Sequence, residues 1–124
     1  MQLKDKVAVI TGAAGGLGRG IGRRFAREGA RLVVCDIDES GLAPLREEIE
    51  AAGGECLALP CDVSSSASVD AMFARTDARF GTVHILVNNA ALVPDKPHDE
   101  ERRKRHYALL AVMFATETMA WPCR

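Results

Sequence analysis

The chain has 124 residues, 48% hydrophobic and 27% charged, which is typical of one globular domain and not of a disordered or fibrous protein. Sixteen lysines and arginines face seventeen acidic residues, so the net charge is -1. This balance argues against a nucleic-acid or anionic-membrane partner, and the aromatic share of 5% argues against stacking on single strands. The first apolar run is too short for a signal peptide or a membrane span, so we expect a cytoplasmic protein.

Four cysteines, Cys35, Cys56, Cys61 and Cys123, form no Cys-x-x-Cys pair, and with three histidines they show no metal-ligand spacing. An even number of cysteines would by itself allow a disulfide. We expect reduced, partly buried thiols and no bound metal, because cytoplasmic thiols stay reduced.

The chain begins with alternating strand and helix patterns. Residues 7–10 form a β-branched run that predicts a strand, and after a glycine cluster residues 18–28 predict a helix that ends at Gly29. Residues 31–35 predict a second strand. Residues 38–52 predict a second helix, because acidic residues stand at their start and a glycine pair follows their end.

The alternation continues up to residue 87. Residues 55–59 predict a third, weaker strand and residues 83–87 a fourth. Residues 66–80 predict a helix, with N-cap serines available at residues 64–66. Strands separated by helices imply β-α-β units, so we expect an α/β fold with a doubly wound parallel sheet and helices on both faces.

Residues 92–124 break this alternation and have no assigned origin. Residues 92–98 carry two prolines and predict a loop, residues 99–105 are a charge run, and residues 108–121 predict an apolar helix. In the charge run, basic residues have acidic partners four positions earlier. This spacing indicates a solvated helix face in preference to a nucleic-acid patch. We therefore treat residues 1–91 as a nucleotide-binding half-domain and the rest separately.

The segment TGAAGGLG directly follows the first predicted strand and opens the first helix. In such a turn one glycine permits a positive φ, a second lets the backbone approach a pyrophosphate, and a third lets the helix pack on the strand. Gly12, Gly16 and Gly18 fit these roles. The helix that follows would point its free N–H groups at the phosphates. Gly20 and Gly22, inside the helix, are expected to pack it against the strand.

Asp36 ends the second predicted strand, where a carboxylate can accept hydrogen bonds from ribose hydroxyls and would repel a 2′-phosphate. Gly15 and Ile37, its expected neighbours around the ribose, are not basic. The sequence therefore favours NAD over NADP. Asp36 and Asp38 are also candidates to cap the next helix, and we assign the cofactor role to Asp36 and the cap to Asp38.

Four markers, in order along the chain, resemble those of the short-chain dehydrogenase/reductase family in its compact single-domain form. They are the glycine-rich turn, Asp36, the pair Asp62 and Val63, and the triplet Asn88, Asn89 and Ala90. The resemblance covers residues 5–91. It implies a Rossmann-like doubly wound parallel sheet, truncated after the fourth strand, and an NAD-dependent oxidation of an alcohol or reduction of a carbonyl by hydride transfer.

The resemblance also implies which residues contact the cofactor. The backbone of the glycine-rich turn would cradle the pyrophosphate, Asp62 would hydrogen-bond the adenine, and Val63 would pack on it. Asn88 and Ala90 would line the nicotinamide-side ribose, while Asn89 would hold the central strands together. The full expected set of cofactor-binding residues is Gly12, Ala14, Gly15, Gly16, Leu17, Gly18, Asp36, Ile37, Asp62, Val63, Asn88 and Ala90.

The chain departs from the family in its catalytic residues. The family uses a Tyr with a Lys four positions later, a Ser and an Asn. Here the one tyrosine, Tyr107, is followed four positions later by Ala111, and the last serine is Ser68. Ala91 also replaces the family's usual Gly, an extra methyl that we expect to be tolerated. We therefore expect no catalytic residue in this chain and no activity of the chain alone, with the substrate unspecified.

Three functional hypotheses remain open. The first is the cofactor-binding half of a dehydrogenase, ended by a premature stop or a frameshift. The second is a non-catalytic NAD-binding module such as a redox sensor. The third, pairing with a full-length relative, is disfavoured because the family's main oligomer contacts come from later helices. In each case, residues 108–121 are a candidate to cover the open edge of the fourth strand.

Overall fold

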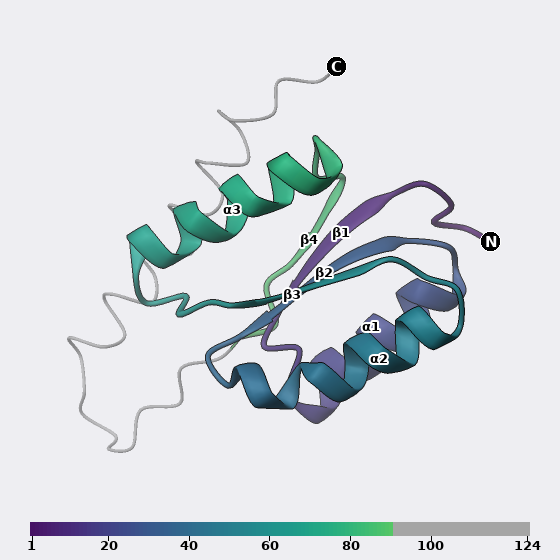
Figure 1. The fold of residues 1–124 in the computed structure, drawn as a ribbon, viewed down its shortest axis with the longest axis horizontal. Coiled ribbons are helices and arrows are strands. Elements are labelled where there is room, and N and C mark those ends of the chain that lie inside the picture. Colours follow the sequence, from purple (N-terminus) through teal and green to yellow (C-terminus); the bar gives the residue numbers. More distant parts are fainter. Residues whose placement is uncertain (91–124) are drawn as a thin grey trace.

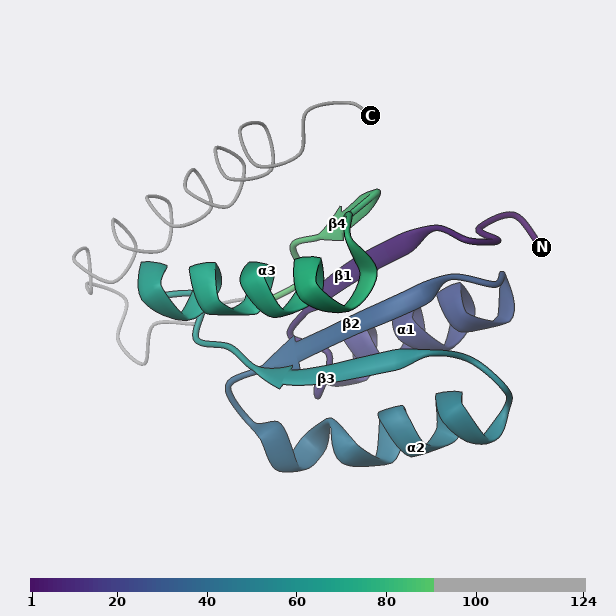
Figure 2. The ribbon, with the colours of Figure 1, turned by 45° about the horizontal axis from the view of Figure 1, so that its top comes forward.

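The computed structural model describes residues 1–90, which form a four-stranded parallel sheet in the order β3-β2-β1-β4. The elements along the chain are β1 (Val7–Thr11), α1 (Gly16–Arg27), β2 (Arg31–Asp36), the 3₁₀ turn η1 (Glu39–Gly41), α2 (Ala43–Ala51), β3 (Cys56–Pro60), α3 (Ser66–Phe80) and β4 (Ile85–Val87). Figure 1 shows α3 on one face of the sheet and α1 and α2 on the other, and Figure 2 shows the strands side by side. This arrangement confirms the predicted α/β fold.

Two hydrophobic cores lie on opposite faces of the sheet, because successive residues of a strand point to opposite sides. The core under α3 includes Val9, Val33, Leu59, Val69, Met72 and Phe73. The core under α1 and α2 includes Ala8, Ile10, Leu32, Val34, Leu45 and Ile49. All five residues of β1 are buried, as expected for a central parallel strand covered on both faces.

The helix predicted over residues 38–52 is wrong at its start, where the structure has η1 followed by α2. Pro44 explains the break. Proline has no backbone N–H, and its ring clashes with the carbonyl four residues earlier, so a helix can begin at a proline but does not run through it. Pro44 accordingly lies in the first turn of α2.

The fourth strand begins at Ile85 and not at residue 83 as predicted. The N–H of His84 donates to the Val7 carbonyl at 2.9 Å, but the N–H of Val7 donates to the His84 side chain, Nδ1, also at 2.9 Å. The imidazole thus replaces a backbone acceptor, and strand pairing starts one residue later, between Ala8 and Ile85. The remaining strands and helices lie within two residues of their predicted bounds, and Ser65 caps α3 as expected.

Gly20 lies on the exposed side of α1, where a Cβ would meet no heavy atom of the described residues within 4 Å. The expectation that it packs against the strand was therefore wrong. Gly20→Ala is expected to raise the free energy of unfolding by about 0.5–1 kcal/mol, because alanine loses less backbone entropy in a helix. Urea denaturation followed by circular dichroism measures this change.

Gly22→Ala is the matched control, since a Cβ there would lie 3.3 Å from Cδ2 of Leu45. This contact with the α2 core should cancel part of the entropic gain. A Gly20→Ala variant less stable than the parent chain would contradict the assignment of open space at this position.

Cys35, Cys56 and Cys61 are free cysteines and are buried, more completely than the predicted partial burial. Within residues 1–90, no helix is long and apolar enough to cross a membrane, and no cluster of His, Cys, Asp and Glu could hold a metal ion. Outside the described residues lie Cys123 and the predictions for Ala91, Tyr107, the loop at 92–98, the charge run at 99–105 and the apolar helix at 108–121.

Candidate functional site

The glycine-rich turn joins the carboxyl end of β1 to α1 and is closely packed on its inner side. Gly12 has a φ of 65°, and a Cβ there would lie 2.9 Å from Cα of Ala90. A Cβ on Gly18 would run into the carbonyl oxygen of Gly12 and would lie 2.7 Å from Nδ2 of Asn89. Gly16, in contrast, has no heavy atom of residues 1–90 within 4 Å of a built Cβ. The turn therefore packs tightly against the protein at Gly12 and Gly18 and is exposed to solvent at Gly16.

Helix α1 begins without a side-chain cap. Its N-cap residue is Gly15, and its first turn contains no acidic residue. The first N–H groups of a helix have no intrahelical partner and form the positive end of the helix dipole. Gly16 and Leu17 are exposed there, Leu17 to 73%. This end of α1 thus offers backbone donors to an anion.

Thr11 ties the end of β1 to the segment after β4. Its side chain is buried, and its hydroxyl donates to the Val87 carbonyl at 3.3 Å. The same oxygen accepts the N–H groups of Asn89 at 3.1 Å and Ala90 at 3.0 Å. Nδ2 of Asn89 donates to the Gly12 carbonyl at 3.2 Å. These bonds fit the expectation that Asn89 holds the central strands together.

Asp36 bonds the glycine-rich turn from the end of β2. Its Oδ2 accepts the N–H of Ala14 at 3.0 Å, and its Oδ1 accepts the N–H of Asp38 at 3.0 Å. Asp38 itself stands at the N-cap position of η1, not of α2, and accepts the Ser40 hydroxyl at 2.6 Å. That hydroxyl holds the pKa of Asp38 below its usual value. Asp36 therefore bonds the glycine-rich turn, while Asp38 bonds Ser40 within η1.

Asp62 follows β3 and is fixed by the next residues of the chain. Its Oδ1 accepts the N–H of Ser64 at 2.9 Å and the Ser64 hydroxyl at 2.6 Å. Its own N–H donates to Oγ of Ser68 at 2.9 Å. Its second oxygen, Oδ2, accepts no hydrogen bond from the part of the chain that the structure describes. One acceptor of this carboxylate is therefore available.

A cavity of about 120 Å³ brings these groups together at the carboxyl ends of the strands. Its lining residues are Gly12, Asp36, Ile37, Cys61, Asp62, Val63 and Ala90. All of them except Cys61 belong to the predicted set. Cys61 is not among the predicted site residues, although its place directly before Asp62 is a signal in the sequence. Thr11 is not among them either, and its signal is a hydroxyl at the end of a buried apolar strand.

The other predicted residues do not line this cavity. Ala14, Gly15, Gly16, Leu17 and Gly18 form the turn and the start of α1 beside it. Asn88 is partly buried, and its Oδ1 finds no hydrogen-bond donor within residues 1–90. The structure therefore groups half of the predicted set around one cavity, and the other half does not line it.

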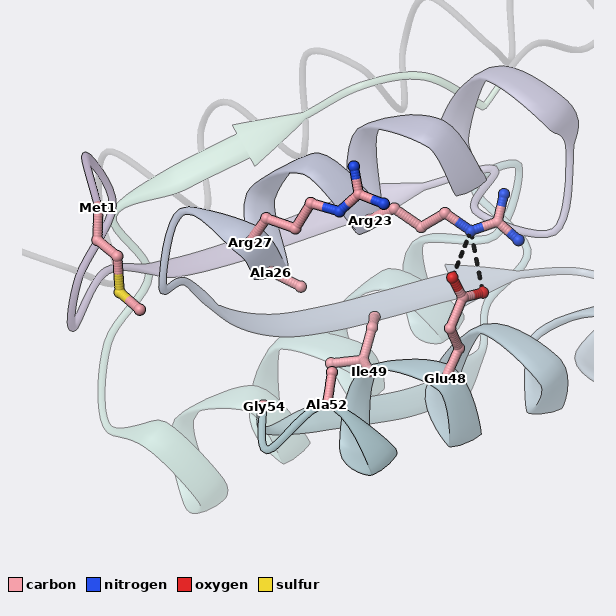
Figure 3. Close-up of a pocket in the computed structure, with 8 residues that line it drawn as sticks. All are labelled: Met1, Arg23, Ala26, Arg27, Glu48, Ile49, Ala52 and Gly54. Atoms are coloured by element: carbon pink, nitrogen blue, oxygen red, sulfur yellow. Dashed lines mark hydrogen bonds and ion pairs between the residues drawn. The ribbon is translucent and has the colours of Figure 1, made fainter.

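A larger cavity, of about 350 Å³, lies between α1 and α2 (Figure 3). At one end, Nε of Arg23 donates to both carboxylate oxygens of Glu48 at 2.9 Å, and Met1 lies at the other end. None of the predicted site residues lines it. The C-terminal halves of α1 and α2 line this cavity. Because the helices run antiparallel to the strands, these halves lie toward the amino ends of the strands. Open α/β sheets bind their ligands at the opposite, carboxyl ends. The smaller cavity is therefore the candidate site.

The sequence matches the short chain dehydrogenase family over residues 6–119, and the chain belongs to this family. The match extends beyond the residues that carry the four markers. A short chain dehydrogenase/reductase of Macrophomina phaseolina is 42% identical over 93 residues, which are 74% of this chain and 53% of that protein. Galactitol 2-dehydrogenase of Agrobacterium fabrum is 42% identical over 97 residues, 78% of this chain and 37% of that enzyme. The chain thus spans about half the length of these relatives, or less.

Solved structures share the fold. A short chain dehydrogenase/reductase from Burkholderia phymatum in complex with NAD has a TM-score of 0.81 and 32% identity, covering 97% of this chain and 46% of that chain. A metagenomic short-chain oxidoreductase in complex with NADP has a TM-score of 0.81 and 33% identity, covering 97% and 59%. These similarities confirm the Rossmann-like fold and the recognised family. These two neighbours were solved with different dinucleotides, one with NAD and one with NADP.

Proposed function

We propose that this chain is the cofactor-binding part of a short-chain dehydrogenase/reductase and binds NAD at the carboxyl ends of β1, β2, β3 and β4, with the adenosine part of NAD in the cavity there. One observation supports this proposal: Asp36, Asp62 and Ala90 line the same cavity as Gly12 of the glycine-rich turn. These residues come from three different strand ends. Their convergence gives one site the groups that a dinucleotide needs.

The groups present fit the parts of a dinucleotide. Each carboxylate oxygen of Asp36 accepts one N–H and keeps a lone pair for a ribose hydroxyl. Oδ2 of Asp62 can accept from the adenine amino group, with Val63 against the ring. The uncapped start of α1, with open space at Gly16, suits the pyrophosphate. Asn88 and Ala90 would lie near the nicotinamide-side ribose.

The charges around Asp36 favour NAD over NADP. A carboxylate at this position repels a 2′-phosphate, and the neighbouring Ile37 is apolar and 74% exposed. Arg19, the basic side chain bound at the turn, is engaged with the carbonyls of Ala14 at 3.1 Å and Gly41 at 3.3 Å. These two bonds occupy both N–H groups of its Nη2 with backbone carbonyls.

We further propose that the chain binds the cofactor without turning over a substrate. Bound NAD supplies the hydride chemistry, and the protein must supply orientation and a proton. The sequence has one tyrosine, with alanine four positions later, so it contains no Tyr-x-x-x-Lys motif. A non-catalytic NAD-binding module is the second candidate, favoured by the same observation. In either case a dehydrogenase assay of the chain should show no reduction of NAD, and NAD binding should persist.

Asp36→Asn is expected to weaken NAD binding about 10- to 100-fold, because hydrogen bonds to a charged acceptor contribute about 1.5–3 kcal/mol. It should also reduce the difference between the affinities for NAD and for NADP, because the charge that repels the 2′-phosphate is removed. Isothermal titration calorimetry of the full chain with each dinucleotide measures both effects.

Asp38→Asn is the matched control, because Asp38 lies two positions away and does not line the cavity. It should bind NAD like the parent chain. Equal NAD affinity in the parent and in a folded Asp36→Asn variant would overturn the role of Asp36. A folded parent chain that binds neither dinucleotide would overturn the proposed function.

A further inference from the structure

Arg19 lies in the first turn of α1, and none of the proposed cofactor contacts involves it. One nitrogen of its guanidinium, Nη2, donates to the Ala14 carbonyl at 3.1 Å and to the Gly41 carbonyl at 3.3 Å. Ala14 belongs to the glycine-rich turn, and Gly41 is the last residue of η1. The Arg19 side chain thus joins the start of α1 and the turn before it to a segment 22 positions further along the chain.

Ala14 is bonded to a charged side chain at each of its two backbone polar groups. Its N–H donates to Oδ2 of Asp36 at 3.0 Å, and its carbonyl accepts from the Arg19 guanidinium. Hydrogen bonds with a charged partner are stronger than those between neutral groups. Ala14 directly precedes Gly15, the N-cap residue of α1. These two bonds therefore fix the backbone that leads into the free N–H groups at the start of the helix.

The glycine-rich turn and η1 also pack directly against each other. A Cβ on Gly41 would lie only 2.8 Å from Cβ of Ala14, so the two segments approach too closely for a side chain at this position. η1 follows Asp36 and Ile37, which both line the cavity. The bonds of Arg19 thus connect the turn proposed to hold the pyrophosphate with the segment proposed to hold the adenosine ribose.

Arg19 does not form an ion pair with any carboxylate of residues 1–90. Its Nε is buried and finds no hydrogen-bond acceptor in the same part of the chain. Arg23, one turn further along α1, is different, since its Nε donates to both carboxylate oxygens of Glu48 at 2.9 Å. The contacts of the Arg19 guanidinium are therefore the two backbone carbonyls, and its role follows from the segments that carry them.

We propose that Arg19 is a positioning residue for NAD, because its guanidinium holds the glycine-rich turn and η1 together in the arrangement that binds the dinucleotide. In this role Arg19 acts through Ala14 and Gly41 and does not itself contact the cofactor. A chain that adopts the binding arrangement for only a fraction of the time binds its ligand more weakly by that fraction. This inference rests on the proposed function, because the order of the turn affects affinity only if NAD binds there.

The test compares the NAD affinities of three variants of the full chain by isothermal titration calorimetry. Arg19→Met removes both bonds but keeps an unbranched side chain, and it should weaken NAD binding about tenfold, the loss expected if the turn is ordered a tenth of the time. Arg19→Lys keeps the charge and can donate to one carbonyl, so its affinity should lie between those of Arg19→Met and the parent chain. Arg23→Met is the matched control, since it makes the same change one turn along α1, and it should bind NAD like the parent chain.

Equal NAD affinity in the parent chain and in a folded Arg19→Met variant would overturn the proposal. If Arg19→Met does not fold, Arg19→Lys provides the same comparison, and an affinity equal to that of the parent chain would overturn the proposal in the same way.

Amide hydrogen exchange without NAD separates positioning from general stability and from the proposed function. In Arg19→Met, the amides of Ala14 and Leu42, which donate to Asp36 and to η1, should exchange about tenfold faster, because the turn and η1 open locally. The amides of Val33 and Val34 in β2 should keep their rates. Equal acceleration at all four amides would indicate a global loss of stability and overturn the positioning role. Local acceleration in Arg19→Met, with a parent chain that binds no dinucleotide, would contradict the proposed function and leave the connection between the turn and η1 established.

Discussion

Gly18→Ala is expected to lower the free energy of unfolding by about 1–3 kcal/mol and to reduce NAD binding strongly, because the new methyl has no room. A Cβ on Gly18 would overlap the carbonyl oxygen of Gly12 and would lie 2.9 Å from Cα of Ala13. Both are backbone atoms, which cannot turn aside as a side chain can. The glycine-rich turn must therefore move away from α1. Urea denaturation and calorimetric titration with NAD measure the two effects.

Gly16→Ala is the control that separates folding from binding. A Cβ on Gly16 meets no heavy atom of residues 1–90 within 4 Å, so the variant should be at least as stable as the parent chain. If the pyrophosphate lies against this residue, NAD affinity should still fall about tenfold, because the methyl keeps the phosphates from the backbone. A Gly18→Ala variant as stable as Gly16→Ala would show that the turn is looser than its contacts indicate.

Thr11→Val should destabilise the chain by about 2–4 kcal/mol, although the two side chains have nearly the same shape. The N–H groups of Asn89 and Ala90 both donate to the Thr11 hydroxyl. Valine leaves the Ala90 N–H without an acceptor, while the Asn89 N–H keeps its second acceptor, the Val87 carbonyl at 3.0 Å. A buried donor left unpaired costs about 1–3 kcal/mol, and a lost hydrogen bond costs about 0.5–1.5 kcal/mol. Hydrogen exchange at the Ala90 amide should accelerate more than exchange elsewhere in the sheet.

Thr11→Ser is the matched control, since it keeps the oxygen and loses one methyl group. Its cost should be about 1 kcal/mol, the value of the apolar surface removed. If Thr11→Val and Thr11→Ser were equally stable, the hydroxyl would not be the group that joins β1 to the segment after β4.

Much of the fold follows from local sequence patterns. The buried strands and α3 match their predicted ranges closely, because hydrophobic periodicity and turn residues agree there. The errors arose where one residue overrides a pattern. Pro44 divides the predicted second helix, and the His84 imidazole replaces a backbone acceptor and shortens the fourth strand. The prediction for Gly20 was wrong for another reason: the residue type alone does not say which side of a helix meets the sheet.

The candidate site was predictable to the extent that strand ends determine it. The carboxyl ends of parallel strands meet at one edge, so Asp36, Asp62 and Ala90 could be grouped before their positions were known. Thr11 and Cys61 were missed for a different reason. Their positions depend on neighbours from other strands, namely the amides after β4 for Thr11 and the Asp36 carbonyl at the end of β2 for Cys61, and no local pattern indicates either contact.

Backbone amide chemical shifts of the full chain, recorded during a titration with NAD, show which residues the dinucleotide contacts. The largest changes should fall on Gly12, Asp36, Asp62 and Ala90 and on the first turn of α1. Changes centred instead on the cavity between α1 and α2, near Arg27, or a well-dispersed spectrum that NAD leaves unchanged, would contradict NAD binding at the carboxyl ends of the strands.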